Sequence, residues 1–126
     1  MSNSTVELTD QNFESTLAKG GIMIIDFWAA WCGPCRSFAP VFEAAAQKHT
    51  DVIFAKVNTE EQQGLAQAFE IQAIPTLAIF KDGVMLGQNS GALPAPALED
   101  LLKQVREIDM EKVKAEIAAR KAAEKS

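Results

Sequence analysis

Residues 22–28 narrow the possible folds of this 126-residue chain more than any other segment. The segment is a run of apolar side chains broken only by Asp26, and two glycines precede it. A near-continuous apolar run is typical of a strand that is buried on both faces, as in parallel sheets. A helical pattern follows directly over residues 32–48, with apolar side chains at helical spacing between Phe38 and Ala46. A buried strand that leads straight into a helix favours an α/β fold.

The remainder of the chain repeats this alternation. We expect further strands at residues 5–8, 52–57, 76–80 and 84–86. We expect helices to begin at Thr9 or Asp10, at Thr59, and at Pro94 or Pro96. Because Asp82-Gly83 lies between two apolar runs, the last two strands should form a hairpin. The order β-α-β-α-β-α-β-β-α predicts a parallel sheet core that helices cover on both faces, with an antiparallel portion.

Composition and charge limit the classes of partner. Hydrophobic residues make up 48% of the chain, which is enough for one packed core. The net charge of −5 argues against nucleic-acid binding, because phosphate contacts need a basic face. No apolar run is long enough to cross a bilayer, and the first 21 residues do not resemble a secretory signal. We therefore expect a cytoplasmic monomer with no membrane partner.

The composition changes near Val105, so we divide the chain into a main domain, residues 1–105, and a charged helical extension, residues 106–126. The extension carries a net charge of +1, which leaves −6 for the main domain. Met110, Val113 and Ile117 form an apolar stripe rotated away from that of the preceding helix. This pattern predicts either one helix that changes face near Asp109 or a separate helical tail.

The chemistry is concentrated in the segment Trp31-Cys32-Gly33-Pro34-Cys35, which follows the buried strand and opens a helix. Cysteines at i and i+3 in a first helical turn lie on one face and can form a disulfide. Near the helix N-terminus, Cys32 should have a pKa below the ordinary thiol value of about 8.5. We therefore predict that Cys32 is the attacking nucleophile and that Cys35, one turn inside, resolves the mixed disulfide.

Two other interpretations of the cysteine pair are weaker. An idle structural pair would rarely fall at this spacing between a strand and a helix. A zinc site needs at least three protein ligands, and beyond these two sulfurs only His49 is available, some four turns along the helix. We predict no bound metal and no bound cofactor.

Four further positions can be interpreted from their local sequence alone. Asp26, in the middle of an apolar strand, should be desolvated and have a raised pKa, with Lys56 as a partial partner. It could then accept the proton of Cys35, unless it lies at a strand end in contact with water. Pro75 taken alone is an ordinary trans proline. Gly91 taken alone is a turn residue, and Trp31 could be a plain core aromatic.

Together these residues resemble the thioredoxin family over residues 5–105, in order and in spacing. The resemblance implies a central mixed sheet of about five strands flanked by four helices, with Cys32 exposed and Cys35 shielded. It implies a cis Pro75 facing the disulfide and a proton-transfer role for Asp26 beside Lys56. It also implies that the backbone of Ile74 pairs with an extended substrate. The docking surface would consist of Trp31, Gly33, Pro34, Ile74, Pro75, Gly91 and Ala92. Arg36 departs from the usual Lys, and Phe69 stands where the family often has Tyr.

The function that follows from the resemblance is reduction of protein disulfides through the Cys32–Cys35 couple. Electrons would come from NADPH through a flavoprotein, thioredoxin reductase, and the substrates would be disulfide-containing proteins. Gly33-Pro34 between the cysteines is typical of reductases, whereas oxidases and isomerases usually carry a histidine there. A disulfide oxidase or isomerase is the alternative within redox chemistry. A binding or chaperone role that uses the C-terminal extension is the alternative outside it.

Overall fold

The computed structural model describes residues 4–124. Residues 1–3 of the predicted main domain and residues 125–126 of the predicted extension lie outside the described residues. The strands are β1 (Val6–Glu7), β2 (Ile22–Trp28), β3 (Ile53–Asn58), β4 (Thr76–Lys81) and β5 (Val84–Ser90). The helices are α1 (Phe13–Leu17), α2 (Gly33–Lys48), α3 (Gln63–Ala68), α4 (Ala95–Glu107) and α5 (Met110–Glu124). The predicted element order is confirmed, with α5 as an additional helix.

The five strands form one mixed sheet in the order β1-β3-β2-β4-β5. β1, β3 and β2 are parallel, and β4 and β5 are antiparallel to their neighbours. β2 is central, and its bounds are those predicted from the apolar run. Asp26 pairs in register with Lys56 on β3 and with Leu77 on β4.

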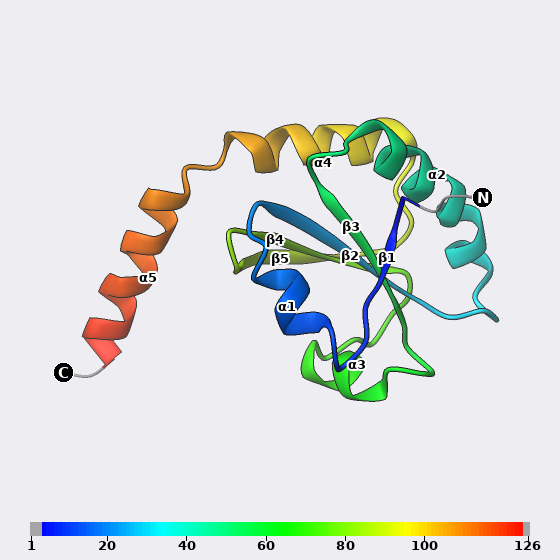
Figure 1. The fold of residues 1–126 in the computed structure, drawn as a ribbon, viewed down its shortest axis with the longest axis horizontal. Helices are drawn as coiled ribbons and strands as arrows, with labels where there is room; N and C mark the ends of the chain where they lie inside the picture. The colour runs from blue at the N-terminus through cyan, green and yellow to red at the C-terminus, as the bar shows by residue number, and fades with distance from the viewer. Residues whose placement is uncertain (1–3, 125–126) are drawn as a thin grey trace.

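Helices cover both faces of the sheet, α2 and α4 on one and α1 and α3 on the other (Figure 1). Alternate residues of β2 enter the two resulting cores, because successive side chains of a strand point to opposite faces. Ile22 and Ile24 join the core under α2 and α4, whereas Met23, Ile25 and Phe27 join the other. The side chain of Asp26 therefore points to the face of the sheet that α2 covers.

The predicted hairpin between β4 and β5 is confirmed. Asp82 and Gly83 both have positive φ, 51° and 80°, which a two-residue turn of this kind requires. The Asp82 carboxylate also accepts a hydrogen bond from the backbone N–H of Gly21 at 3.0 Å. β5 continues to Ser90, beyond its apolar residues, because the ladder with β4 extends to Thr76.

The predicted starts of α1 and α3 were wrong by several residues. α3 begins after Gln62, and the side chain of Thr59 does not cap it. Instead the N–H and hydroxyl of Thr59 both donate to the carbonyl of Trp28, at 2.9 and 3.1 Å. This carbonyl lies at the end of β2, where the ladder stops and an acceptor is left over. Similarly, the Thr9 hydroxyl caps the turn before α1 rather than α1 itself, which begins after Asn12.

The second of the two predicted alternatives holds, because α5 is a helical tail separate from α4. Arg106 and Glu107, predicted to belong to the extension, still lie in α4. α4 ends at Glu107, the backbone of Ile108 is extended, and the carboxylate of Asp109 caps the first turn of α5. Figure 1 shows α5 running away from the sheet at the end of α4. Met110 is buried, and the remaining described residues of α5 are exposed or half-buried.

The side chain of Lys81 fixes this junction. Its ammonium donates to the carbonyls of Val105, Arg106 and Ile108 at 2.8, 3.1 and 2.8 Å. Carbonyls at a helix C-terminus lack partners within the helix, and a cation there also interacts favourably with the helix dipole. The end of β4 thus sets where α4 stops and where α5 starts.

Candidate active site

The cysteine pair lies where β2 passes into α2. Cys32 occupies the N-cap position, with φ −86° and ψ 113°, and Pro34 lies in the first turn. The backbone N–H of Cys35 donates to Cys32 Sγ at 3.2 Å. The two sulfurs are joined in a disulfide, with their Cα atoms 5.2 Å apart. The predicted geometry of the pair is confirmed, and the helix start directs a donor at the sulfur of Cys32.

The expectation that Cys32 is exposed was wrong for this disulfide-bonded state. Cys32 and Cys35 are exposed by only 4% and 3%. Cys32 Sγ is bonded to its partner and lies 3.7 Å from the carbonyl oxygen of Ile74, which approaches from a distant loop. The neighbouring Trp31 is instead 66% exposed, so the predicted core alternative for this tryptophan was wrong.

The loop before β4 brings Ile74 and Pro75 to the disulfide. The Ile74–Pro75 peptide bond is cis, as the resemblance implied and contrary to the residue-based expectation. The N–H of Gly91 donates to the carbonyl of Pro75 at 2.8 Å, and Gly91 has φ 101°, which favours glycine. Ala92 is exposed beside it. The loop of Ile74 and Pro75 therefore contacts Cys32 on one side and Gly91 on the other.

Asp26 is a buried carboxyl group on the central strand. It is 1% exposed, and neither carboxyl oxygen has a hydrogen-bond partner within residues 4–124. Burial raises the pKa of Asp26 from 3.8 to about 7, and the charge of Lys56 opposes this rise. The alternative of a strand-end residue in contact with water was therefore wrong.

Lys56 is the cross-strand neighbour of Asp26 but not its ion-pair partner in the described part of the chain. Its ammonium lies 5.0 Å from the ring centroid of Trp28, a cation–π distance. The lysine thus lowers the pKa of Asp26 through space without satisfying its oxygens.

Sequence reasoning missed Glu60. Its carboxylate accepts a hydrogen bond from the indole N–H of Trp31 at 2.9 Å. The available signal was topological: β2 and β3 are parallel, so the residues that follow each strand meet at one edge of the sheet.

The only histidine lies in a different network, away from the cysteines. His49 contacts Glu99 at 2.8 Å and Arg106 at 3.2 Å, and Arg106 pairs with Asp51. Within residues 4–124, no group of three or more His, Cys, Asp or Glu side chains could hold a metal ion. No helix in this part of the chain is sufficiently long and apolar to span a membrane.

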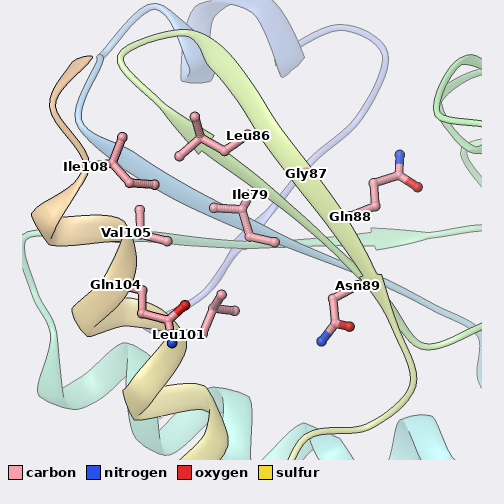
Figure 2. A pocket seen from close by; sticks show the side chains of 9 residues that line it. All are labelled: Ile79, Leu86, Gly87, Gln88, Asn89, Leu101, Gln104, Val105 and Ile108. Carbon is pink, nitrogen blue, oxygen red and sulfur yellow. The ribbon is translucent and has the colours of Figure 1, made fainter. Parts of the chain in front are cut away.

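A cavity of about 260 Å³ lies between β5 and α4 (Figure 2). It is lined by Ile79, Leu86, Gly87, Gln88, Asn89, Leu101, Gln104, Val105 and Ile108. None of these residues belongs to the predicted site. The cavity is therefore separate from the surface around the disulfide.

A disulfide at the head of a helix, above a buried carboxyl group on a mixed sheet, defines the class of dithiol–disulfide oxidoreductases. The thioredoxin family model matches residues 4–123. A putative thioredoxin 2 from Streptomyces coelicolor is 49% identical over 119 residues, covering 94% of this chain and 89% of the relative. A thioredoxin from Alicyclobacillus acidocaldarius is 44% identical over 103 residues, covering 81% of this chain and 98% of the relative.

A solved structure of a Plasmodium falciparum thioredoxin superposes with a TM-score of 0.73 at 30% identity, covering 79% of this chain and 98% of that one. The chain belongs to the thioredoxin family. It is a protein-disulfide reductase that acts by thiol–disulfide exchange through Cys32 and Cys35. The family match continues past residue 105, where the resemblance noted in the sequence ended.

Proposed function

We propose that Cys32 is the nucleophile and Cys35 the resolving thiol of a general protein-disulfide reductase. In the reduced protein, the Cys32 thiolate attacks one sulfur of a substrate disulfide, forms a mixed disulfide and expels the first substrate thiolate. Cys35 then attacks Cys32 Sγ, forms the Cys32–Cys35 disulfide and expels the second thiolate. Two electrons and two protons pass to the substrate. The observation that carries this assignment is the N-cap position of Cys32, where a backbone donor points at its sulfur.

In this proposal Asp26 accepts the proton that Cys35 must lose before it attacks. The carboxyl group lies on the sheet face that carries α2, and its pKa of about 7 suits proton transfer at neutral pH. The positive charge of Lys56 lowers the pKa of Asp26 and so adjusts this proton acceptor.

Substrate docks, in this proposal, on the apolar surface around the disulfide. Ile74 pairs through its backbone with an extended substrate segment, a small case of strand addition. The contact surface consists of Trp31, Gly33, Pro34, Ile74, Pro75, Gly91 and Ala92. The exposure of Trp31 and the close approach of the Ile74 carbonyl to Cys32 support this arrangement.

We place the reductase in the cytoplasm, where thioredoxin reductase, a flavoprotein, would restore the dithiol with electrons from NADPH. A two-electron exchange protein needs such a donor for every turnover. Residues 106–126 are proposed as an extension distinct from the redox domain.

The function is tested by reduction of insulin with dithiothreitol as the electron donor. We expect the wild-type protein to accelerate insulin precipitation and a Cys32→Ser, Cys35→Ser double variant to leave it at the uncatalysed rate. Equal rates for the two proteins would refute the reductase. Equilibration against glutathione then distinguishes a reductase from an oxidase, since an oxidant stays reduced at poises where a reductase is already oxidised.

A further inference from the structure

Trp31 is a large exposed aromatic side chain whose orientation is fixed by one hydrogen bond. An indole exposed to this extent ordinarily samples several rotamers, and ordering it on binding costs affinity. Here its only donor, Nε1–H, is held by a Glu60 carboxylate oxygen at 2.9 Å. A hydrogen bond to a carboxylate is stronger than one to a neutral acceptor. The indole is thus oriented before substrate arrives.

Glu60 is itself held by the turn that follows β3. Its backbone N–H donates to the side chain of Asn58 at 2.9 Å. The preceding Thr59 binds the carbonyl of Trp28 through both its N–H and its hydroxyl. Since Trp28 ends the strand that leads into the redox motif, the carboxylate and the indole are both anchored to that strand end.

The charge of Glu60 is not neutralised by the protein. Within residues 4–124, Glu60 forms no ion pair with any cation. The cation next to the redox motif, Arg36, donates to the carbonyl of Ala30 at 2.8 Å instead. An exposed negative charge therefore lies at the edge of the docking surface, and the exposed Arg36 guanidinium lies beside Gly33 on the same surface.

We infer that Glu60 positions Trp31 for docking and gives the reductase a preference for disulfides flanked by Lys or Arg. The inference rests on the proposed docking surface. A cation beside the reacting cysteine of the substrate would pair with the free carboxylate oxygen, while the indole packs on the neighbouring apolar side chains. An exposed pair of this kind changes kcat/KM by about two- to fivefold, and high salt screens it.

Two disulfide-linked model peptides that differ only in Lys or Glu beside the cysteine provide the test. For the wild type, we expect kcat/KM to favour the Lys peptide about two- to fivefold at low salt. Glu60→Gln keeps an acceptor for the indole but no charge, so the preference for the Lys peptide should vanish. A third peptide, with a neutral residue beside the cysteine, measures docking without the charge contribution. Glu60→Ala removes both functions, so KM for that neutral peptide should rise and the indole N–H resonance of Trp31 should shift.

Glu61→Gln is the matched control, because Glu61 is the next residue, is exposed and forms no side-chain ion pair within residues 4–124. It should keep the preference. A preference that survives in Glu60→Gln, or that Glu61→Gln removes equally, overturns the charge assignment. An unchanged KM and indole resonance in Glu60→Ala overturn the positioning role. Failure of the proposed reductase would look different, because no peptide would then be reduced above the rate of the Cys32→Ser, Cys35→Ser variant.

Discussion

Asp26 shows how far one residue can depart from the chemistry of its neighbours. Every other residue of β2 is apolar, and burial shields the carboxyl group from water. Within residues 4–124 its oxygens also have no hydrogen-bond partner. An ionised carboxylate in such a place is costly, so the neutral form is favoured and the pKa rises. The same burial gives the group a pKa useful for proton transfer near neutral pH.

The stability cost of Asp26 should depend on pH. Its folded pKa lies above its unfolded value, so the folded state binds the proton more tightly and stability falls as pH rises from about 4 to about 7. The shift from 3.8 to about 7 corresponds to roughly 4 kcal/mol once both states are ionised. We expect Asp26→Asn to be more stable than wild type by about this amount at pH 8, and by less than about 1 kcal/mol at pH 4. Denaturant unfolding of the oxidised proteins measures both values, and a difference that does not change with pH contradicts the prediction.

The kinetic role of Asp26 is a separate prediction. Without a proton acceptor, Cys35 should attack the mixed disulfide more slowly, so Asp26→Ala should lengthen the lifetime of that intermediate by about tenfold or more. The first attack, by Cys32, should change much less. Rapid-quench trapping of the mixed disulfide measures the lifetime, with Cys35→Ser as the control that cannot resolve. Equal lifetimes in variant and wild type would remove Asp26 from the mechanism.

At the scale of helices and strands, side chains at or just after the ends of strands form the hydrogen bonds that fix where neighbouring elements begin and end. Thr59 closes the end of β2, Asn58 fixes the turn after β3, and Lys81 at the end of β4 holds the last carbonyls of α4. Each contact satisfies backbone groups that a helix or sheet leaves without partners. The contacts of Thr59 and Lys81 also connect segments that are neighbours in space but not in sequence, whereas that of Asn58 is local.

Removal of the Lys81 ammonium should loosen the junction between α4 and α5. Lys81→Met keeps the apolar stem and leaves three carbonyls without this donor, so we expect a loss of about 1–2 kcal/mol in the free energy of unfolding. Amide hydrogen exchange at the junction should also become faster. Lys103→Met, on the exposed face of α4, is the control and should change stability by less than about 0.5 kcal/mol. Indistinguishable stabilities for the two variants would show that the three hydrogen bonds contribute nothing measurable.

The whole molecule combines a sheet covered on both faces with a helix that leaves it. The two cores lie on opposite faces of one sheet, and α5 begins only where α4 has ended (Figure 1). Met110 is the one described residue of α5 that is buried. We therefore expect most of α5 to contribute little to the free energy of unfolding.

Two truncations test this division. Removal of residues 114–126 should change the free energy of unfolding by less than about 0.5 kcal/mol, because the described side chains removed are exposed or half-buried. Removal of residues 110–126 also removes Met110 and should cost about 1–2 kcal/mol. Both truncated proteins should reduce insulin at the wild-type rate. A large loss from the shorter truncation would mean that α5 packs on the body beyond its first turn.

Much of the fold followed from local patterns. The apolar run of β2, the Asp82-Gly83 turn and the inner stripe of α4 are encoded by neighbouring residues, so a single sequence predicts them. The starts of α1 and α3 were misplaced because Thr9 and Thr59 can cap more than one local structure. Thr59 binds the free carbonyl of Trp28 at the end of β2, and Thr9 caps the turn before α1, so neither caps the helix that follows it.

The sequence by itself determined that Cys32 and Cys35 share the first turn of a helix behind a buried strand, because spacing and hydrophobic period are local properties. Only the tertiary structure decided the cis isomer of Pro75 and the burial of Cys32 next to the Ile74 carbonyl. It also decided the hydrogen bond from Trp31 to Glu60 and those from Lys81 to the last carbonyls of α4. Each of these depends on residues that are distant along the chain and meet only when the sheet assembles. The conformational preferences of neighbouring residues cannot specify such contacts, because the contacts form only when the helices and strands pack together.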